Sequence, residues 1–599
     1  MVACAAGFSA AGASRAALLF GNILFAFVSP VSAGAFLGKG QDLDLPDGGE
    51  VGRDLLADLE RVAGQDHRTA VEARVALLAD VLRPTFNALP RTGEDKIDAA
   101  SVRYLLHRVF VDRHGWHVRG LHAEGAAWDS ASPADMFQDH RAVHGLFSDR
   151  LAHGFSLRDV AVFAATLEKF VHMETVARLE TAYNVLDLPT DQDVEGVAKA
   201  EEVLDTFMAM FVFGIDHTTA SKAEVLRAVR SAGNTHTGWK ETQDWIRQVR
   251  RELLYAAGVE PQGASASGAS ASGPLSFNAS TRVVEEAAER YGRWQNQDCD
   301  AVKSSLVELE GVPGTGRVWL DTFYESALNG SWMFTESADY LRALGALDET
   351  DPKRPSVIIP NYVNSPSNCL ASSKYYSVCC VDECEVILSS LERNIAAPLA
   401  SPARVAELVA RLPPATVPAP REIPATLVRR LEEIAAANAG QVPLHGRLFA
   451  QWLHHLYPRE CPFPQLFGTT QPTTPKEFRK QTGKEALAVE SGMREHITNA
   501  RNSSASAGHA RSSAPVSVGG MDDTDNETCA VMPWSAQEEL FVRGRTPEPA
   551  DALRFGGWGG RIAFAALAAS IGLSLARVVL AASAGATAST SAKQGKSFV

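Results

Sequence analysis

Apolar positions spaced three and four residues apart predict helices through the first half of the chain. One such helix face consists of Val160, Phe163, Leu167, Phe170 and Val171. Ser156 precedes this face with Asp159 three residues on, which is the pattern of a capping box that opens a helix. Similar patterns run through residues 203–213 and 239–255. We therefore predict a helical domain over residues 51–259.

A run of Gly, Ala and Ser at residues 261–274 cannot bury a core, and it predicts a linker over residues 260–275. The pattern then becomes mixed over residues 276–470, which we predict to be a second, mostly helical domain. Its predicted elements are helices at residues 281–294, 403–412, 423–437 and 444–456 and a short strand at 356–360. The polar loop at residues 361–384 needs covalent closure to stay ordered.

Residues 471–560 are rich in Ser, Thr, Ala and Gly with scattered prolines. This composition predicts a flexible, disordered stalk with one short amphipathic segment near residues 534–541. The expected fold class is thus mainly α.

Two apolar runs near the ends of the chain predict a membrane protein of the secretory pathway. Arg15 precedes 13 apolar residues at 16–28, and small residues follow at 31–33, so residues 1–33 are typical of a cleaved signal peptide. Residues 562–582 form a 21-residue run with Arg577 near its inner end. A helix of this length crosses about 30 Å of hydrocarbon. We expect a single-pass protein with an extracellular or lumenal ectodomain and a cytosolic tail at residues 583–599.

The cysteines agree with that location. Six of eight are clustered: Cys299, Cys369, Cys379, Cys380, Cys384 and Cys461. Their spacing lacks the paired C-x2-C units of zinc sites and the C-x-x-C of redox enzymes, so we predict three disulfides, with 15 connectivities open. Of the other two cysteines, Cys4 lies in the predicted signal peptide, and Cys529 is a candidate for an interchain bond, for example in a homodimer. Glycosylation candidates are Asn278, Asn329, Asn502 and Asn526.

The chain has 599 residues, 45% of them hydrophobic, and a formal net charge of −14. No basic stripe interleaved with aromatic residues is present, which argues against a nucleic-acid partner. The membrane is the expected partner, and we predict no cofactor.

Histidines are concentrated between residues 107 and 172. The metal-binding candidates are His107, His114, His117, His140 and His144. His140 and His144 are four residues apart and would share one helix face, but H-E-x-x-H is absent. The mixture of cations, aromatics and apolar residues around His107 is more typical of a hydrogen-bonded helix end.

Residues 75–110 have a helix–loop–helix outline that resembles the EF-hand family over this one segment. Aligning Ile97 with loop position eight places Pro90 first, Asp95 sixth and Ser101 twelfth. The acidic first ligand, the central glycine and the bidentate glutamate are therefore missing, and the calcium ligands do not carry over.

Two other motifs could belong to a catalytic or a phosphate-binding site, but a structural role explains each of them more simply. Cys461 follows His454 and His455 and could be a nucleophile, but a disulfide to the cysteine cluster is simpler. The glycine-rich residues 311–316 lack the G-K-[ST] that binds phosphate and magnesium, and we predict a turn.

Seven segments distributed over both domains carry a further resemblance. They are residues 102–110 (VRYLLHRVF), 113–116 (RHGW), 155–159 (FSLRD), 376–380 (YSVCC), 383–385 (ECE), 443–452 (PLHGRLFAQW) and 457–462 (YPRECP). They resemble an uncharacterised family of membrane-anchored proteins from single-celled algae of the dinoflagellate type. The resemblance implies that both domains belong together, and it implies no activity.

Three functions follow as hypotheses. The first is a non-catalytic ectodomain that acts in adhesion, scaffolding or recognition. The alternatives are a metal-dependent lumenal enzyme that uses the histidines of residues 107–172, and a calcium-responsive EF-hand-like protein.

Overall fold

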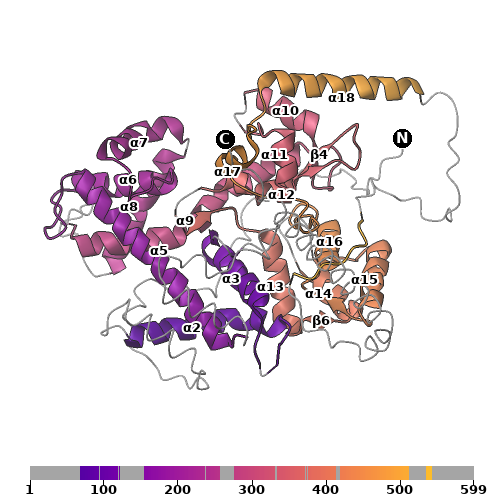
Figure 1. Cartoon of the computed structure of the whole chain (residues 1–599), viewed down its shortest axis with the longest axis horizontal. Coiled ribbons are helices and arrows are strands. Elements are labelled where there is room, and N and C mark those ends of the chain that lie inside the picture. Colours follow the sequence, from indigo (N-terminus) through magenta and orange to yellow (C-terminus); the bar gives the residue numbers. More distant parts are fainter. Residues whose placement is uncertain are drawn as a thin grey trace, which may run out of the picture. The chain divides into compact units, whose positions relative to one another are not determined.

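The structure is a computed structural model in which eleven segments of the chain are described (Figure 1). These segments are residues 68–93, 95–118, 121, 154–236, 238–256, 275–330, 333–370, 373, 375–412, 419–510 and 534–541. The predicted signal peptide, the predicted span at residues 562–582 and the cytosolic tail lie outside them, as do His140, His144, Asn526 and Cys529. The described residues are mainly helical with a few short strands, as predicted.

Long helices build the N-terminal region, which we define as the described residues of 68–256. They are α2 (Arg68–Ala88), α3 (Ala99–His114), α5 (Leu157–Val185), α6 (Val197–Val212), α7 (Lys222–Thr235) and α8 (Trp239–Ala256). The predicted capping box is confirmed, because the Ser156 side chain accepts from the Asp159 amide and Asp159 accepts from the Ser156 amide. Phe163 and Val160 on α5 are buried in the resulting core, so the predicted helix face is also confirmed.

The helix that follows the predicted linker belongs to two cores. Helix α9 (Phe277–Glu308) has 32 residues. Its first half places Val284 and Tyr291 in the core of the N-terminal region, against α5 and α8. Its second half places Leu306 in the next core. The predicted linker therefore separates the chain in sequence, while residues on its two sides share one hydrophobic core.

Short elements build the cysteine-rich region, which we define as the described residues of 275–510. After α9 come β2 (Arg317–Trp319), α10 (Leu320–Leu328), α11 (Ala338–Ala343), β3 (Leu347–Asp348), β4 (Ser356–Ile358), α12 (Ile359–Val363) and the 3-10 turn η5 (Pro366–Asn368). The strand predicted at residues 356–360 is confirmed over its first three residues as β4, and α12 begins directly after it. Strand β4 pairs antiparallel with β2 and β3 in the order β2-β4-β3. Aromatic side chains, among them Phe323, Tyr340 and Tyr362, fill the core beside this sheet.

The next elements along the chain lead to a third core, which contains Trp452. They are β5 (Tyr376–Val378), α13 (Glu383–Ile395), β6 (Leu399–Ala400), α14 (Pro402–Ala410), α15 (Ala425–Ala437), β7 (Val442–Pro443) and α16 (Arg447–Leu456). Trp452 is fully buried and its indole N–H donates to the carbonyl of Leu427 at 2.7 Å, which ties α16 to α15. The four helices predicted for this domain are thus present as α9, α14, α15 and α16.

Part of the predicted stalk is folded instead. Residues 475–510 form α17 (Pro475–Thr482) and α18 (Glu490–Ala510). Phe478, Met493 and Ile497 are buried in the same core as α10. Composition misled the prediction because these few apolar side chains are spaced along helix faces, so they complete a core supplied by residues far earlier in the chain. Residues 511–533 and 542–560 of the predicted stalk lie outside the described residues.

Strand pairing also joins the two sides of the linker. Strand β1 (Trp116–Val118) pairs antiparallel with β5, with Trp116 opposite Val378.

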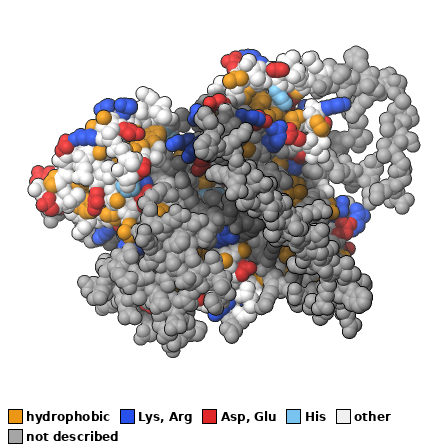
Figure 2. Space-filling view, in the orientation of Figure 1, with side chains coloured by type: hydrophobic (Ala, Val, Ile, Leu, Met, Phe, Trp, Pro, Cys, Tyr) orange, Lys and Arg blue, Asp and Glu red, His pale blue; other side chains and the backbone are white. Residues whose placement is uncertain are grey.

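Among the described residues, none of the helices has both the length and the hydrophobicity that a membrane span requires. On the face seen in Figure 2, acidic and basic side chains are interspersed over the described residues.

Candidate functional site: a buried charged network beside the disulfides

The six clustered cysteines form three pairs at disulfide distance, as predicted. The pairs are Cys299–Cys380, Cys369–Cys379 and Cys384–Cys461. The first joins α9 to the segment before α13, and the third joins α13 to the residues after α16. Cys461 is fully buried and bonded, so the disulfide interpretation of this residue is supported over the nucleophile.

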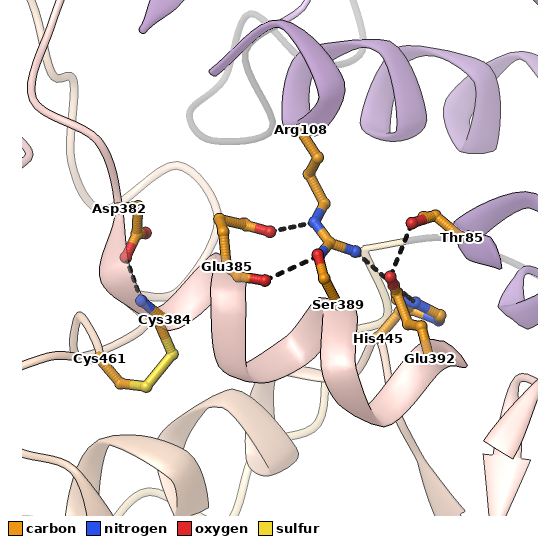
Figure 3. Close-up of polar contacts among 9 residues, drawn as sticks. All are labelled: Thr85, Arg108, Asp382, Cys384, Glu385, Ser389, Glu392, His445 and Cys461. Carbon is orange, nitrogen blue, oxygen red and sulfur yellow. Dashed lines mark hydrogen bonds and ion pairs between the residues drawn. A yellow bond between two sulfur atoms is a disulfide. The ribbon is translucent and has the colours of Figure 1, made fainter. Parts of the chain in front are cut away.

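From the residue after Cys384 onward, helix α13 carries a polar stripe that faces the N-terminal region. Its members are Glu385, Ser389 and Glu392, at positions i, i+4 and i+7 of one helix face. Arg108 of α3 projects between them, and its guanidinium contacts both carboxylates, as Figure 3 shows. It also donates to the Ser389 hydroxyl at 2.9 Å. Arg108 is only 4% exposed, so these contacts satisfy a charge in the interior.

Glu392 is where four chain segments meet. Its side chain is fully buried. The Thr85 hydroxyl of α2 donates to Oε2 at 2.7 Å, and Nε2 of His445 lies 2.8 Å from Oε1. With Arg108 on α3, the carboxylate of this α13 residue thus joins α2, α3 and the segment before α16 (Figure 3).

The surroundings shift the pKa values of the acids in opposite directions. Burial alone would raise the pKa of Glu392, but the charge of Arg108 and the hydrogen bonds from His445 and Thr85 lower it to about 2. Burial raises the pKa of Glu385, and the charge of Arg108 opposes that rise only in part. Burial would lower the pKa of Arg108, yet the two carboxylates raise it well above its ordinary value.

The charged groups of this network can hold chain segments together. A guanidinium held between two carboxylates keeps its proton, and the described contacts use its donors within the protein. Removing one member would leave an uncompensated charge in the interior, which is costly. The network therefore fixes the N-terminal region against α13.

The predicted metal ligands are only partly brought together. The ring centroids of His107 and His117 lie 5.2 Å apart, with the two rings edge to face. His114 turns elsewhere, because its ring stacks on Trp116 at 4.2 Å and its Nδ1 lies 3.3 Å from the Glu289 carbonyl oxygen. Within the described ranges, no group of three or more His, Cys, Asp or Glu side chains is placed to hold a metal ion.

The helix–loop–helix outline at residues 75–110 is present as α2, a loop and α3. Ile97 pairs through its backbone with Phe155, at 3.0 and 2.9 Å, just before α5. Asp95 stands exposed with φ of 62°, and Arg91 lies 3.7 Å from its carboxylate. The loop is thus fixed by a backbone bridge to the residues that precede α5.

The glycine-rich residues 311–316 form a turn around a carboxylate of the chain itself, which confirms the predicted turn. The amides of Gly314 and Gly316 donate to Glu310 at 2.7 and 2.9 Å. Arg459 binds both oxygens of the same carboxylate. The two amides of this turn are therefore bound to a carboxylate of the chain itself.

The described glycosylation candidates differ in setting. Asn329 is exposed at the end of α10, and Asn502 is exposed on α18. Asn278 is exposed on α9, but Ser280 of its sequon is buried, with its hydroxyl 2.8 Å from that of Tyr183.

Sequence reasoning missed the charged network. Arg108 and Glu392 are 284 residues apart, and no local pattern connects them. The polar stripe of residues 385, 389 and 392 gave no signal either, because charged and polar residues at this spacing are also typical of a solvent-exposed helix face. Comparisons with protein-family models, with curated proteins and with solved structures found no match to this chain.

Proposed function

We propose that this chain is a single-pass membrane protein whose ectodomain faces an oxidising compartment and acts by recognition, adhesion or scaffolding. The pairing of all six clustered cysteines is the observation that carries the proposal. Disulfides persist in secreted and lumenal proteins and are rare in the cytosol. The apolar runs at residues 16–28 and 562–582 support the same location.

The binding role is supported by the arrangement of the polar groups. The buried network at Arg108 and the turn at Glu310 use their charges to hold chain segments together. The six cysteines are committed to pairs. These residues are therefore explained as parts of a scaffold that holds a surface in shape.

The topology can be tested with the full-length protein carrying a C-terminal epitope tag in a eukaryotic cell. We expect the protein to resist alkaline carbonate extraction, and we expect added protease to remove the tag from sealed vesicles while residues 68–510 stay protected. A variant with Leu567→Arg and Leu573→Arg is the control, because charges near the centre of the run should release the protein. Extraction of the wild-type protein by carbonate would overturn the anchored topology.

Peptide mapping without reduction tests the compartment independently. We expect the linked peptides Cys299–Cys380, Cys369–Cys379 and Cys384–Cys461. Quantitative alkylation of these six cysteines in freshly lysed cells would contradict an oxidising location.

The metal-dependent alternative is favoured by one observation, the proximity of His107 and His117. Elemental analysis of the purified protein tests it. Stoichiometric zinc, iron or copper that is lost in a His107→Ala, His117→Ala variant would favour the enzyme over the scaffold.

A further inference from the structure

A short segment near the C-terminal end of the described chain lies against the beginning of α16. Residues 534–541 reach this position after residues 511–533, which are outside the described part of the chain. Leu540 forms an antiparallel bridge with Gly446. The amide of Arg447 donates to the carbonyl of Glu539 at 2.8 Å, and the amide of Phe541 donates to the carbonyl of His445 at 3.0 Å. The segment is thus held by backbone pairing around a single antiparallel bridge.

The guanidinium of Arg447 binds two backbone carbonyls of the segment. Arg447 is fully buried. Its Nε donates to the carbonyl of Gln537 and its Nη2 to the carbonyl of Ser535, both at 2.8 Å. Without the segment, these two donors would lose their partners in the chain.

Two glutamates of the segment bind backbone amides. Glu538 accepts from the Leu448 amide at 3.0 Å, in the first turn of the ten-residue helix α16. Glu539 accepts from the Phe467 amide at 2.9 Å. A carboxylate at the N-terminus of a helix is favoured by the exposed amides and by the helix dipole. Gly446 allows the approach, since a Cβ there would lie 3.1 Å from the Glu538 carboxylate.

Aromatic side chains bind both ends of the segment. The ring of Trp534 lies 5.4 Å from that of His455, and the guanidinium of Arg430 lies over it at 5.0 Å. The ring of Phe541 meets that of Phe467 at 5.8 Å. Recognition by added backbone pairing, a charge at a helix end and two aromatic anchors is typical of peptide-binding domains.

From these contacts we infer that the surface around Arg447 is a peptide-recognition site. We define this α16 cradle by His445, Arg447, Leu448, His455 and Phe467. It fits an extended acidic peptide with an aromatic residue at each end. Residues 534–541 are its ligand within this chain, and a segment of the same chemistry from another protein exchanges with them. Such a site would work in the same way with or without a membrane anchor.

The test uses the full-length protein and a fluorescent peptide of residues 532–543. In one variant, Trp534→Ala, Glu538→Gln and Phe541→Ala remove the anchors of the resident segment and leave the α16 cradle intact. We expect at least tenfold tighter peptide binding to this variant than to the wild-type protein, where the site is occupied. Hydrogen exchange should show the Leu448 and Phe467 amides losing protection in the variant and regaining it with peptide.

Changes in the peptide keep the test independent of protein folding. A peptide with Glu538→Gln and one with Trp534→Ala should each bind the variant about tenfold more weakly, and a scrambled peptide should not compete. Equal binding of these peptides, equal binding to wild type and variant, or unchanged protection of the two amides in the variant would each overturn the inference.

Discussion

The N-terminal region and the cysteine-rich region differ in the length of their helices and in their covalent cross-links. Helices α2 and α5 of the N-terminal region have 21 and 29 residues, whereas α10, α11 and α12 of the cysteine-rich region have nine, six and five. A long helix bonds its backbone internally and buries a continuous apolar face. Short elements leave more of the chain in loops, so more entropy is lost per apolar contact. All three cysteine pairs lie within the cysteine-rich region, where these short elements are.

Removing a disulfide should therefore have the largest effect, and mainly on one region. Cys384→Ser with Cys461→Ser opens a loop of sequence separation 77. We expect a loss of about 4 kcal/mol in the free energy of unfolding. The pair Cys369–Cys379, with a separation of 10, should cost about 3 kcal/mol. Chemical denaturation with hydrogen exchange measures both. Cys529→Ser is the control, and equal loss of protection in α5 and α13 would contradict the contrast.

Breaking the junction should affect both regions together. Arg108→Met leaves Glu385 and Glu392 without their cation in the interior. We expect a loss of about 3 to 4 kcal/mol and faster exchange in α2, α3 and α13. Arg342→Met is the matched control, because its partners Asp339 and Glu349 are exposed and the pair is worth about 0.5 kcal/mol. Similar losses for the two variants would show that burial does not decide the effect.

Acid should weaken the same junction. The pKa of Glu392 is lowered to about 2 in the folded protein, against an ordinary value of 4.5. A lowered pKa contributes stability above the unfolded value, and this contribution is lost as pH falls from about 4.5 to about 2. We expect about 3 kcal/mol from this group. Urea midpoints of wild type and Glu392→Gln between pH 7 and pH 3 measure it. The variant should be less stable at pH 7 and approach the wild type at low pH.

The pKa of Glu285, on the half of α9 that packs against the N-terminal region, is shifted in the opposite direction to that of Glu392. Burial raises the pKa of Glu285 on α9 to about 7, Lys169 opposes the rise, and His172 lies 3.1 Å from the carboxylate. A raised pKa gives stability that is present below the unfolded value and lost as pH rises through about 7. Glu285→Gln, which keeps the neutral form, should gain about 1 to 2 kcal/mol at pH 8 and nothing at pH 4. Thermal unfolding at the two pH values checks it, and a loss at pH 8 would reverse the assignment.

Helix caps should give the smallest effect and the same size in both regions. Ser156 on α5 and Thr474 on α17 both form capping boxes. Replacement of either by Ala should cost about 1 kcal/mol, since one amide loses its acceptor in each case. Local hydrogen exchange should place the first change in α5 and the second in α17. A much larger effect at Thr474 would mean that short helices depend on their caps more than long ones do.

Local patterns predicted what depends on neighbours in sequence. The capping box at Ser156, the helix faces and the strand at residue 356 all rest on spacings of a few residues. The set of bonded cysteines was also predictable, but composition carries no information on which of the 15 connectivities forms.

The contacts that could not be predicted from the sequence join residues that are far apart in the chain. Trp116 pairs with Val378, and Arg108 meets Glu392, only because helices from both sides of the linker pack together. The segment at residues 534–541 was expected to be amphipathic. It forms no helix or strand, and two of its backbone carbonyls are bound by Arg447, whose position is set by tertiary packing.

The linker after α8 has a consequence for limited proteolysis. Each of the three cysteine pairs lies beyond residue 298, so none of them would connect the two fragments produced by a cut within residues 257–274. The fragments would nevertheless remain associated through α9, the β1–β5 pairing and the Arg108 contacts. A clipped molecule would thus migrate as one particle on a sizing column and as two polypeptides in detergent without any reductant.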